Sequence, residues 1–156
     1  MSDSQLIWEG RVNAEWVDYN NHMNDAAYAI VFSMALDSML DKIGLDEAFR
    51  EQNHYTAYTL ETHVLYRKEA VLDEKLDVFV QILDKDEKRL HLWMEMKNES
   101  SELAAASEQM IMGMDQAAGR PAPFPPALVK GIEALPHTEA EFRPSMAGRA
   151  IGIKKK

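Results

Sequence analysis

The 156-residue sequence contains no cysteine. This absence excludes disulfide bridges, thiolate nucleophiles and cysteine-ligated zinc sites. A chain of this length predicts a single domain over residues 1–156, with its core at about residues 6–114 and a C-terminal extension over residues 115–156. Such a domain buries roughly 68–70% of the surface that its unfolded chain exposes. The core therefore needs no covalent or metal support.

Long apolar runs are missing as well. No stretch of the sequence approaches the roughly 20 apolar residues of a membrane-spanning helix. The opening MSDSQLIWEGR has neither the basic start nor the apolar stretch of a secretory signal. We therefore expect a soluble, cytoplasmic protein that makes no membrane contact.

Basic residues are scarce, with 17 lysines and arginines against 26 acidic residues and a net charge of -9. Nucleic-acid binding needs a concentrated basic face, so we expect no nucleic-acid partner. An anionic small molecule needs only two or three local basic groups and remains compatible with this charge. The histidines show no metal-ligand spacing, so we predict no metal site.

The strongest helix prediction covers residues 26–43. Neither glycine nor proline interrupts this stretch, Asn24 and Asp25 are good N-cap residues, and Gly44 suits the left-handed position after a helix. Its first half, residues 26–32, has no charged residue and no clear polar face. This pattern predicts a helix that is buried on most of its sides.

Strand patterns follow the helix. Residues 75–83 and 89–97 alternate apolar and polar with a period of two, and residues 55–66 and 103–114 are also strand-like. Residues 6–17 read as a short strand or extended arm. Short turns join the four later strands, which favours antiparallel neighbours. The expected fold class is α+β, with one antiparallel sheet of about five strands wrapped round one long helix.

The two faces of this sheet have different expected roles. Met110, Met112 and Met114 lie at strand period and are most simply core residues. Aromatic and polar side chains would point to the opposite face, which predicts a surface for a second copy of the chain. These side chains are Phe79, His91 and Trp93. We expect a homodimer or homotetramer.

After residue 115 the composition changes. Residues 119–126 contain four prolines and are not expected to form regular structure. A short helix is expected over residues 128–135, and the remaining tail is expected to be mostly irregular.

The segment WVDYNNHMNDAAY, residues 16–28, resembles the signature of the 4-hydroxybenzoyl-CoA thioesterase family. That signature has an Asp, three residues, a His, an apolar residue, then Asn-Asn and a Tyr at the start of a helix. It is matched by Asp18, His22, Met23, Asn24 and Tyr28. The order of one strand, one helix and four strands is also similar to the family's hotdog fold.

The resemblance implies an acyl-CoA thioesterase whose coenzyme A is part of the substrate, with no separate cofactor. The sequence departs from many members at Trp16, Asn21 and Asp25, where an acid, a glycine and a second asparagine are common. The motif, together with the segment AGRAIGI at residues 147–153, further resembles the thioesterases of carnitine breakdown. Those act on betainyl-CoA, whose acyl group is a quaternary ammonium.

Thioester hydrolysis needs a nucleophile or base beside the carbonyl carbon and positive dipoles at the carbonyl oxygen. The resemblance implies that Asp18 is the nucleophile or the general base, and both roles remain open. The free N–H groups at the helix start are candidate donors to the carbonyl oxygen. We also place His22 and Asn24 in the catalytic set, although His22 could simply fix the loop and Asn24 could act only as an N-cap. A turn-forming role is the structural alternative for Asp18.

The remaining candidates concern binding. For substrate binding we predict Trp16, Asp25, Tyr28 and Glu61. Glu61 either faces water or lines the site, where it would face a cationic acyl group. The Trp16 ring either packs in the core or attracts that cation, and Tyr28 fits packing together with a backbone N–H at the site. Aromatic faces at Tyr58 and Trp93 are further candidates. In hotdog dimers, the strand that holds Glu61 approaches the helix start of the neighbouring subunit. For the phosphates of CoA we predict Arg67, Lys68 and Arg89.

Two other functions fit the same fold. Hotdog hydratases and dehydratases resemble a His followed shortly by Pro-Gly, whereas His22 is followed by Met-Asn-Asp. A non-catalytic acyl-CoA-binding domain would bind the ester and release no thiol. The motif therefore favours the thioesterase.

Overall fold

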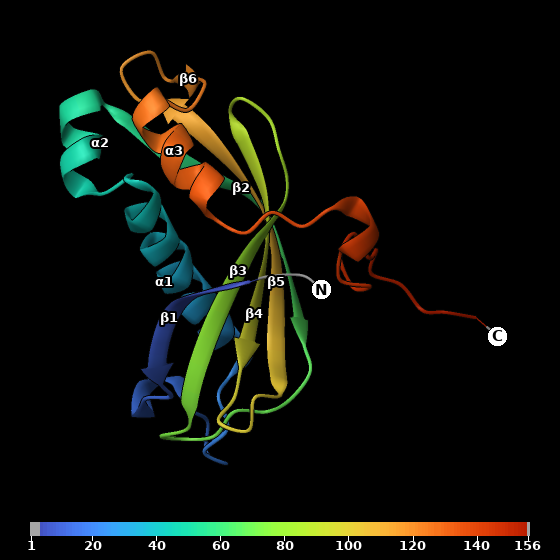
Figure 1. The fold of residues 1–156 in the computed structure, drawn as a ribbon. Helices are drawn as coiled ribbons and strands as arrows, with labels where there is room; N and C mark the ends of the chain where they lie inside the picture. Colours follow the sequence, from blue (N-terminus) through green and yellow to red (C-terminus); the bar gives the residue numbers. More distant parts are fainter. Residues whose placement is uncertain (1–3, 156) are drawn as a thin grey trace.

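The structure, a computed structural model, describes residues 4–155. A curled antiparallel sheet carries one long helix, α1 (Asp25–Ile43), across its inner face (Figure 1). The strands follow the order β1-β3-β4-β5-β2, and the short β6 pairs with β5. The strands are β1 (Gln5–Arg11), β2 (Tyr55–Tyr66), β3 (Lys75–Lys85), β4 (Arg89–Lys97), β5 (Leu103–Asp115) and β6 (Arg120–Pro121). This arrangement confirms the predicted α+β architecture.

Two shorter helices and two 3-10 turns complete the described part of the chain. The helices are α2 (Glu47–Asn53) and α3 (Pro126–Ala134), and the turns are Ala14–Trp16 and Ala140–Phe142. The predicted short helix is therefore α3. The proline-rich stretch expected to be irregular contains the two-residue strand β6, because an edge position lets Pro121 join a sheet that needs no N–H from it.

Local sequence fixes both ends of α1. The side chain of Asn24 accepts a hydrogen bond from the Ala27 N–H, and Gly44 adopts a left-handed conformation with φ 104°. The Gly44 N–H then closes the helix by donating to the carbonyl of Asp41. Both caps were predicted from residue type. Within residues 4–155, no helix combines the length and apolar character needed to cross a bilayer.

The core lies between α1 and the inner face of the sheet. Val31, Ala35 and Met39 of α1 are 0% exposed. They pack against fully buried side chains of the sheet, which include Leu76, Val78, Val80, Leu90, Leu92, Met94 and Ile111. Alternate residues of β3 and β4 point inward, which is why a period of two marked these strands in the sequence. The far end of α1 is covered by α3.

The first half of α1 is less enclosed than its apolar pattern predicted. Ala27, Tyr28 and Val31 are buried, but Ala26 and Ala29 are exposed and Ile30 is 46% exposed. The sheet contacts one side of the helix and leaves the other open along β2. The prediction of burial on most sides is therefore wrong for a single chain.

The outer face of the sheet also differs from the prediction. Trp93 was expected to face a second copy, but it is only 1% exposed and lies with Leu83 and Ala106 under Met146 and Ala147. The C-terminal extension thus covers this part of the sheet within the same chain (Figure 1). Its irregular backbone gave no sequence signal for this packing.

The methionines of β5 do not belong to the core. Met110, Met112 and Met114 share a face with Ala106, since alternate residues of a strand point the same way. All three are half-buried on the outer face, and none belongs to the cluster that Met146 and Ala147 cover. We call them the methionine strip. Period alone could not say which face of the sheet held the core.

Strand β2 forms one edge of the sheet. Five consecutive residues at its centre, residues 58–62, are exposed, although side chains alternate between two faces. The register shifts between Thr59 and Glu61, so that Leu60 bulges out and is 52% exposed. A long edge strand with exposed apolar residues is suited to pairing with another strand.

A close helix contact gives the first testable prediction. A Cβ built on Gly131 of α3 would lie 2.7 Å from the carbonyl carbon of Ile43 in α1. Alanine normally stabilises a helix more than glycine does. Here, however, the backbone of Ile43 cannot move away from the added methyl group, so Gly131→Ala should lower the free energy of unfolding by about 1–3 kcal/mol. Urea unfolding measures this change. Lys130→Ala, exposed on the same helix, should stay within about 0.5 kcal/mol of wild type; equal effects of the two changes would contradict the prediction.

Candidate active site

The loop before α1 is built round the carboxylate of Asp18. Its Oδ1 accepts hydrogen bonds from the N–H groups of Asn20 at 2.8 Å and His22 at 3.1 Å. The Asp18 N–H donates to the His22 carbonyl at 2.9 Å, which closes the loop. Asp18 therefore has the turn-forming role considered above. The same bonds fix the orientation of an exposed carboxylate, so this role does not compete with a chemical one.

Asn24 joins this loop to the helix. Its Oδ1 accepts from the Ala27 N–H at 2.9 Å, and its Nδ2 donates to the Trp16 carbonyl at 2.9 Å. The backbone N–H of Asn24 also donates to the Trp16 carbonyl, at 2.9 Å. Both ends of the side-chain amide are thus engaged in holding the backbone. Asn24 positions the helix start relative to Asp18.

A second segment, residues 67–74, packs against the loop. The Met23 N–H donates to the Ala70 carbonyl at 2.7 Å, and His22 forms an isolated bridge with Val71. The His22 Nδ1 lies 3.2 Å from Glu69 Oε2. His22 therefore has a loop-fixing contact, and this contact brings an acidic side chain to the helix start.

The hydroxyl of Tyr28 connects α1 to the same segment. It donates to the Lys68 carbonyl at 3.1 Å and accepts from the Ala70 N–H at 3.1 Å. Burial is the main cause that raises the pKa of Tyr28 above its ordinary value. Its ring meets the ring of Tyr66 edge to face, with centroids 5.3 Å apart. The Tyr66 hydroxyl donates to the Asp25 carbonyl at 3.3 Å.

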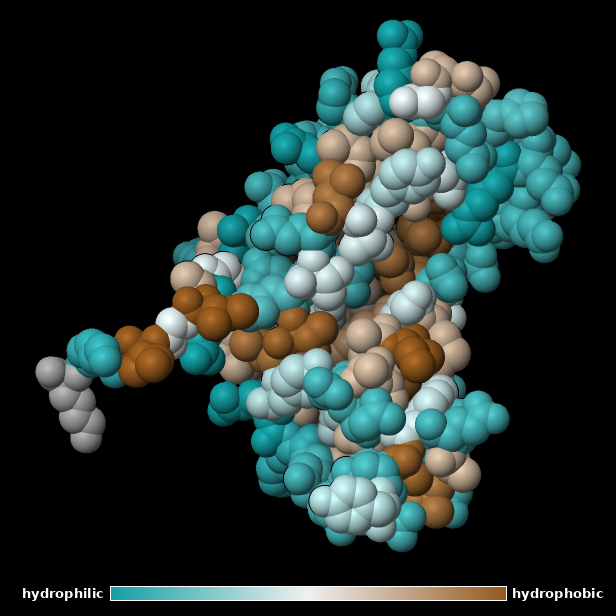
Figure 2. Space-filling view, turned by 180° about the vertical axis from the view of Figure 1, so that it is seen from behind, coloured by the Kyte–Doolittle hydropathy of each residue, from teal (hydrophilic) through white to brown (hydrophobic). Residues whose placement is uncertain are grey.

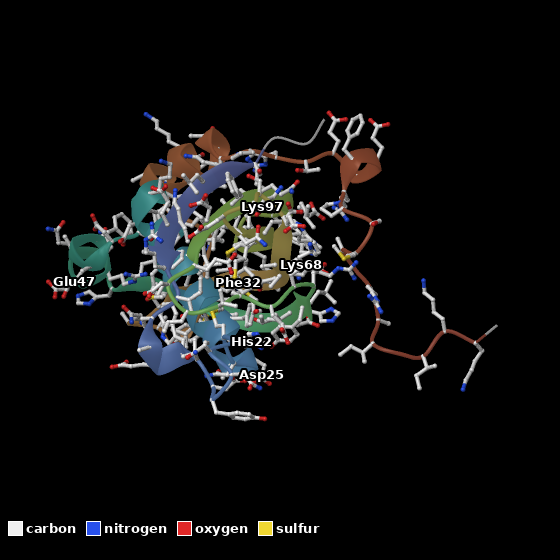
Figure 3. All side chains as sticks on the ribbon, turned by 90° about the horizontal axis from the view of Figure 1, so that it is seen from below. His22, Asp25, Phe32, Glu47, Lys68 and Lys97 are labelled. Carbon is white, nitrogen blue, oxygen red and sulfur yellow. The ribbon has the colours of Figure 1, made fainter. Side chains whose placement is uncertain are left out.

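These contacts surround a cavity of about 270 Å³ at the N-terminal end of α1. It is lined by Met23, Asp25, Tyr28, Tyr66, Arg67, Lys68 and Glu69. Viewed from below, His22 and Asp25 lie near the start of α1, with Lys68 nearby on the segment after β2 (Figure 3). Lys68 also forms an ion pair with Glu102. The structure thus places four of the predicted binding residues, Asp25, Tyr28, Arg67 and Lys68, round one cavity.

Two predicted binding residues lie elsewhere in the same chain. Glu61 is on the outer face of the edge strand, in a cavity that it shares with His63 and His91. Arg89 lines another cavity, where it pairs with Asp86 at 2.5 Å. The hydrogen bond from Arg89 is the main cause that lowers the pKa of Asp86 to about 2. Within one chain these sites are separate from the cavity at the start of α1.

Trp16 contributes to the site through its backbone. Its carbonyl receives both bonds from Asn24, while its half-buried ring packs against the core and does not line the cavity. Sequence reasoning missed Tyr66 and Glu69. Their one signal was their position at the end of a strand, beside Arg67 and Lys68.

No group of three histidine, aspartate or glutamate side chains gathers as a metal site within residues 4–155. The cavity at the start of α1 instead combines a helix N-terminus, an aromatic ring and charges of both signs. Such a site can polarise an oxygen atom of a ligand through the helix dipole and bind charged groups on either side of it.

Comparison with known proteins places this arrangement in a family. A sequence model described as the thioesterase-like superfamily matches residues 12–132, which include the Asp18 loop, α1 and the whole sheet except β1. The chain belongs to the thioesterase-like superfamily. The resemblance seen in the motif at residues 16–28 is thereby confirmed.

Curated relatives of this superfamily member carry one shared description. A betainyl-CoA thioesterase of Pseudomonas aeruginosa is 36% identical over 155 residues, which cover 98% of each chain. An L-carnitine dehydrogenase/betainyl-CoA thioesterase of Agrobacterium fabrum is 38% identical over 152 residues. That match covers 96% of this chain and 31% of the relative, so the chain spans about a third of the length of the two-function proteins.

Solved structures agree in fold. A hypothetical protein of Staphylococcus aureus in complex with CoA superposes with a TM-score of 0.88 at 33% identity, covering 99% of both chains. A predicted thioesterase of Pseudomonas putida KT2440 gives a TM-score of 0.81 at 32% identity, covering 99% of this chain and 100% of the other. The predicted hotdog fold is confirmed.

The Tyr28 hydroxyl gives a prediction that combines packing and pH. Tyr28→Phe leaves the Ala70 N–H and Lys68 carbonyl without their partner and should lower the free energy of unfolding by about 1–3 kcal/mol. The pKa of Tyr28 is raised in the folded protein, so folding favours its neutral hydroxyl. The stability that this hydroxyl contributes is therefore complete below the ordinary pKa of 10.0, and it is lost as the pH rises through the higher pKa of the folded protein. Urea unfolding from pH 7 to 11 measures the difference between the two proteins. The control is Tyr19→Phe, since Tyr19 is 94% exposed; an effect as large as that of Tyr28→Phe would contradict the assignment.

Proposed function

We propose that this protein hydrolyses the thioester of a small acyl-CoA, with betainyl-CoA as its substrate, in the cavity at the start of α1. The observation that carries the proposal is the position of the Asp18 loop, which the two Asn24 bonds to Trp16 hold beside the N-terminus of α1. This pairing supplies both a carboxylate and a positive dipole, which are the two requirements of thioester hydrolysis. The full-length match to a betainyl-CoA thioesterase supports the choice of substrate.

In this mechanism Asp18 presents its Oδ2 to the reaction. Both loop hydrogen bonds fall on Oδ1, so the other oxygen is the one that we assign to the thioester or to the attacking water. As a nucleophile, Asp18 would form an acyl-enzyme anhydride, release CoA thiolate and be regenerated by water. As a general base, it would take a proton from water as that water attacks the carbonyl carbon. The Asx-turn geometry serves either route.

The helix start polarises the carbonyl. The Ala26 and Ala27 N–H groups donate to the side chains of Asp25 and Asn24, so we assign the polarising effect to the positive end of the 19-residue helix as a whole. Its dipole favours the negative charge that develops on the thioester oxygen. Asn24 sets the position of this end, and the Tyr28 hydroxyl holds it against the segment after β2. We therefore assign Asn24 and Tyr28 to positioning and the helix N-terminus to the oxygen.

The cavity has features that suit a trimethylammonium group. Tyr66 is 52% exposed and offers an aromatic ring, and Asp25 and Glu69 add two carboxylates. A cation held over an aromatic face gains about 0.5–2 kcal/mol. Arg67 and Lys68 on the same rim are the groups that we assign to CoA phosphates. These assignments replace Trp16, Tyr58 and Trp93 as aromatic candidates, while Glu61 and Arg89 stay predictions.

We further propose that two copies associate through β2, extending the two sheets into one. The exposed residues 58–62 and the bulge at Leu60 make this edge available, and the open side of α1 lies along it. Pairing would cover Ile30, which a single chain leaves 46% exposed.

A protein that acts on acyl-CoA in this way would work in the cytoplasm.

The catalytic assignment is tested by Asp18→Asn. This change keeps the size of the side chain and both loop hydrogen bonds, so the fold should persist while thiol release from betainyl-CoA falls by about 10² or more. Thiol release with a colorimetric reagent measures the rate. The matched control is Asp37→Asn on the exposed side of α1, which should retain wild-type rates. Rates in Asp18→Asn that equal wild type would remove Asp18 from the mechanism.

Acyl-group selectivity is tested at Tyr66. Tyr66→Leu should lower kcat/KM for betainyl-CoA by roughly 2–30-fold, as expected for the loss of a cation–π contact. It should affect 3,3-dimethylbutanoyl-CoA, the neutral carbon analogue, much less. Tyr66→Phe keeps the aromatic ring and should retain the preference for the cation. A loss that is the same for both esters would mean that Tyr66 does not recognise charge.

A further inference from the structure

The C-terminal arm, residues 149–155, carries apolar side chains that its own chain leaves uncovered. Ile151 is 90% exposed and Ile153 is 83% exposed. The arm runs away from the body without regular structure, and apolar atoms lie along it before the grey end (Figure 1, Figure 2). In an extended segment, residues two apart point to the same side. The arm therefore presents two isoleucines on one face, which marks it as a contact element.

The base of the arm is fixed on the outer face of the sheet. The Gly148 N–H donates to Glu108 Oε1 at 2.7 Å, and Glu108 Oε2 lies 2.6 Å from the Nε2 of His91. Glu61 and His63 of β2 line the same cavity as Gly148 and Arg149. The arm therefore starts beside the edge strand, at the level of residues 61–63.

Pairing of two β2 strands would define what the arm meets next. If the antiparallel pair is centred on Leu60, the middle of the exposed stretch 58–62, each residue lies opposite the one equally distant on the other side of Leu60. Residues 61–63 then face residues 57–59 of the second copy. A two-fold axis perpendicular to the sheet keeps both outer faces on the same side. An arm that leaves one copy at residues 61–63 and runs perpendicular to the paired β2 strands therefore reaches Tyr58 of the second copy. The neighbour of Tyr58 on β5 is Met112.

The surface at that level is suited to the arm. Tyr58 is 50% exposed, and Met112, its neighbour on β5, is half-buried. Of the other two methionines of the strip, Met110 lines a cavity with Gly148 and Arg149, and Met114 pairs with Pro121 of β6. Seven extended residues span roughly 23 Å, and neighbouring strands are about 4.8 Å apart, so the arm is long enough to cross β2 and β5 of the second copy. The arm is basic, with Arg149, Lys154 and Lys155, on a chain of net charge -9.

We propose that the C-terminal arm of each protomer crosses the β2 edge and docks its two isoleucines on Tyr58 and the methionine strip of a second copy of this chain. The proposal rests on the pairing of two copies through β2 that was proposed above. Flexible methionine side chains adapt to such a contact. In this arrangement each arm clasps the other protomer, and the segment AGRAIGI is an assembly element with no part in the chemistry.

The absence of cysteine makes a direct test possible. Two single-cysteine chains with different tags, Ile153→Cys and Met112→Cys, are co-expressed and oxidised under mild conditions. We expect a disulfide-linked species that carries both tags, because docking raises the effective concentration of the two thiols. In a control pair, Gln52→Cys replaces Met112→Cys, since Gln52 is exposed on α2. The yield of the cross-linked species should be about tenfold or more above the yield from this control pair. A yield equal to the control would overturn the proposal.

Two further measurements separate the possible failures. Molar mass by light scattering reports whether the full chain is a dimer: a monomer would refute the β2 pairing and the arm contact with it. A dimer without cross-linking would refute the arm contact alone. A chain that ends at Gly148 should have a dimer dissociation constant raised about tenfold or more, since the buried isoleucines are lost, and should keep its thioesterase activity at saturating protein. A third chain carries both Ile153→Cys and Met112→Cys. A disulfide that forms only within that chain would mean that the arm folds back on its own sheet, and it would overturn the proposal.

Discussion

The amide of Asn24 holds together the two parts on which the site depends. One end of the amide caps α1 and the other binds the Trp16 carbonyl, so the helix start and the Asp18 loop keep a constant separation. A cap alone stabilises a helix by about 1 kcal/mol. The Asn24 cap also sets the direction of the positive end of α1 relative to the Asp18 carboxylate, and the proposed chemistry requires this geometry. The loop bonds of Asp18 and the clamp at Tyr28 add to the same alignment.

The sheet divides the remaining tasks between its two faces. The inner face carries the core and supports α1, whose N-terminus faces the cavity. The outer face is covered in part by the C-terminal extension, which is tied to the sheet by Thr138 on Gln81 and by Arg143 on the Leu83 carbonyl at 2.8 Å. The edge strand β2 connects the two faces, because its exposed centre lies beside α1 on one face and beside the base of the arm on the other.

Much of this organisation could be predicted from residue pattern. The period of two located the strands, and β2 begins and ends at the predicted residues, Tyr55 and Tyr66. Residue type located both caps of α1, since few residues satisfy those positions. The motif spacing correctly placed Asp18 just ahead of a helix start. The pattern failed at the outer face, where Trp93 and the methionine strip were each given the wrong environment, because alternation shows that two faces differ and not what covers either one.

Interactions between residues close together in the chain account for the features that the residue pattern predicted: α1 with its two caps, the order of the long strands, and the Asp18 loop. The pattern predicted neither the short helix α2 nor the two-residue strand β6. Which side chains share the cavity with the helix start depends instead on the tertiary structure. Tyr66 and Glu69 lie about 40 residues after Asp25 and reach it because β2 runs back along α1. It likewise separated Glu61 and Arg89 from that cavity and placed the C-terminal extension over Trp93. Such long-range neighbours are set by the sheet order and the curl of the sheet, which no local pattern of residues records.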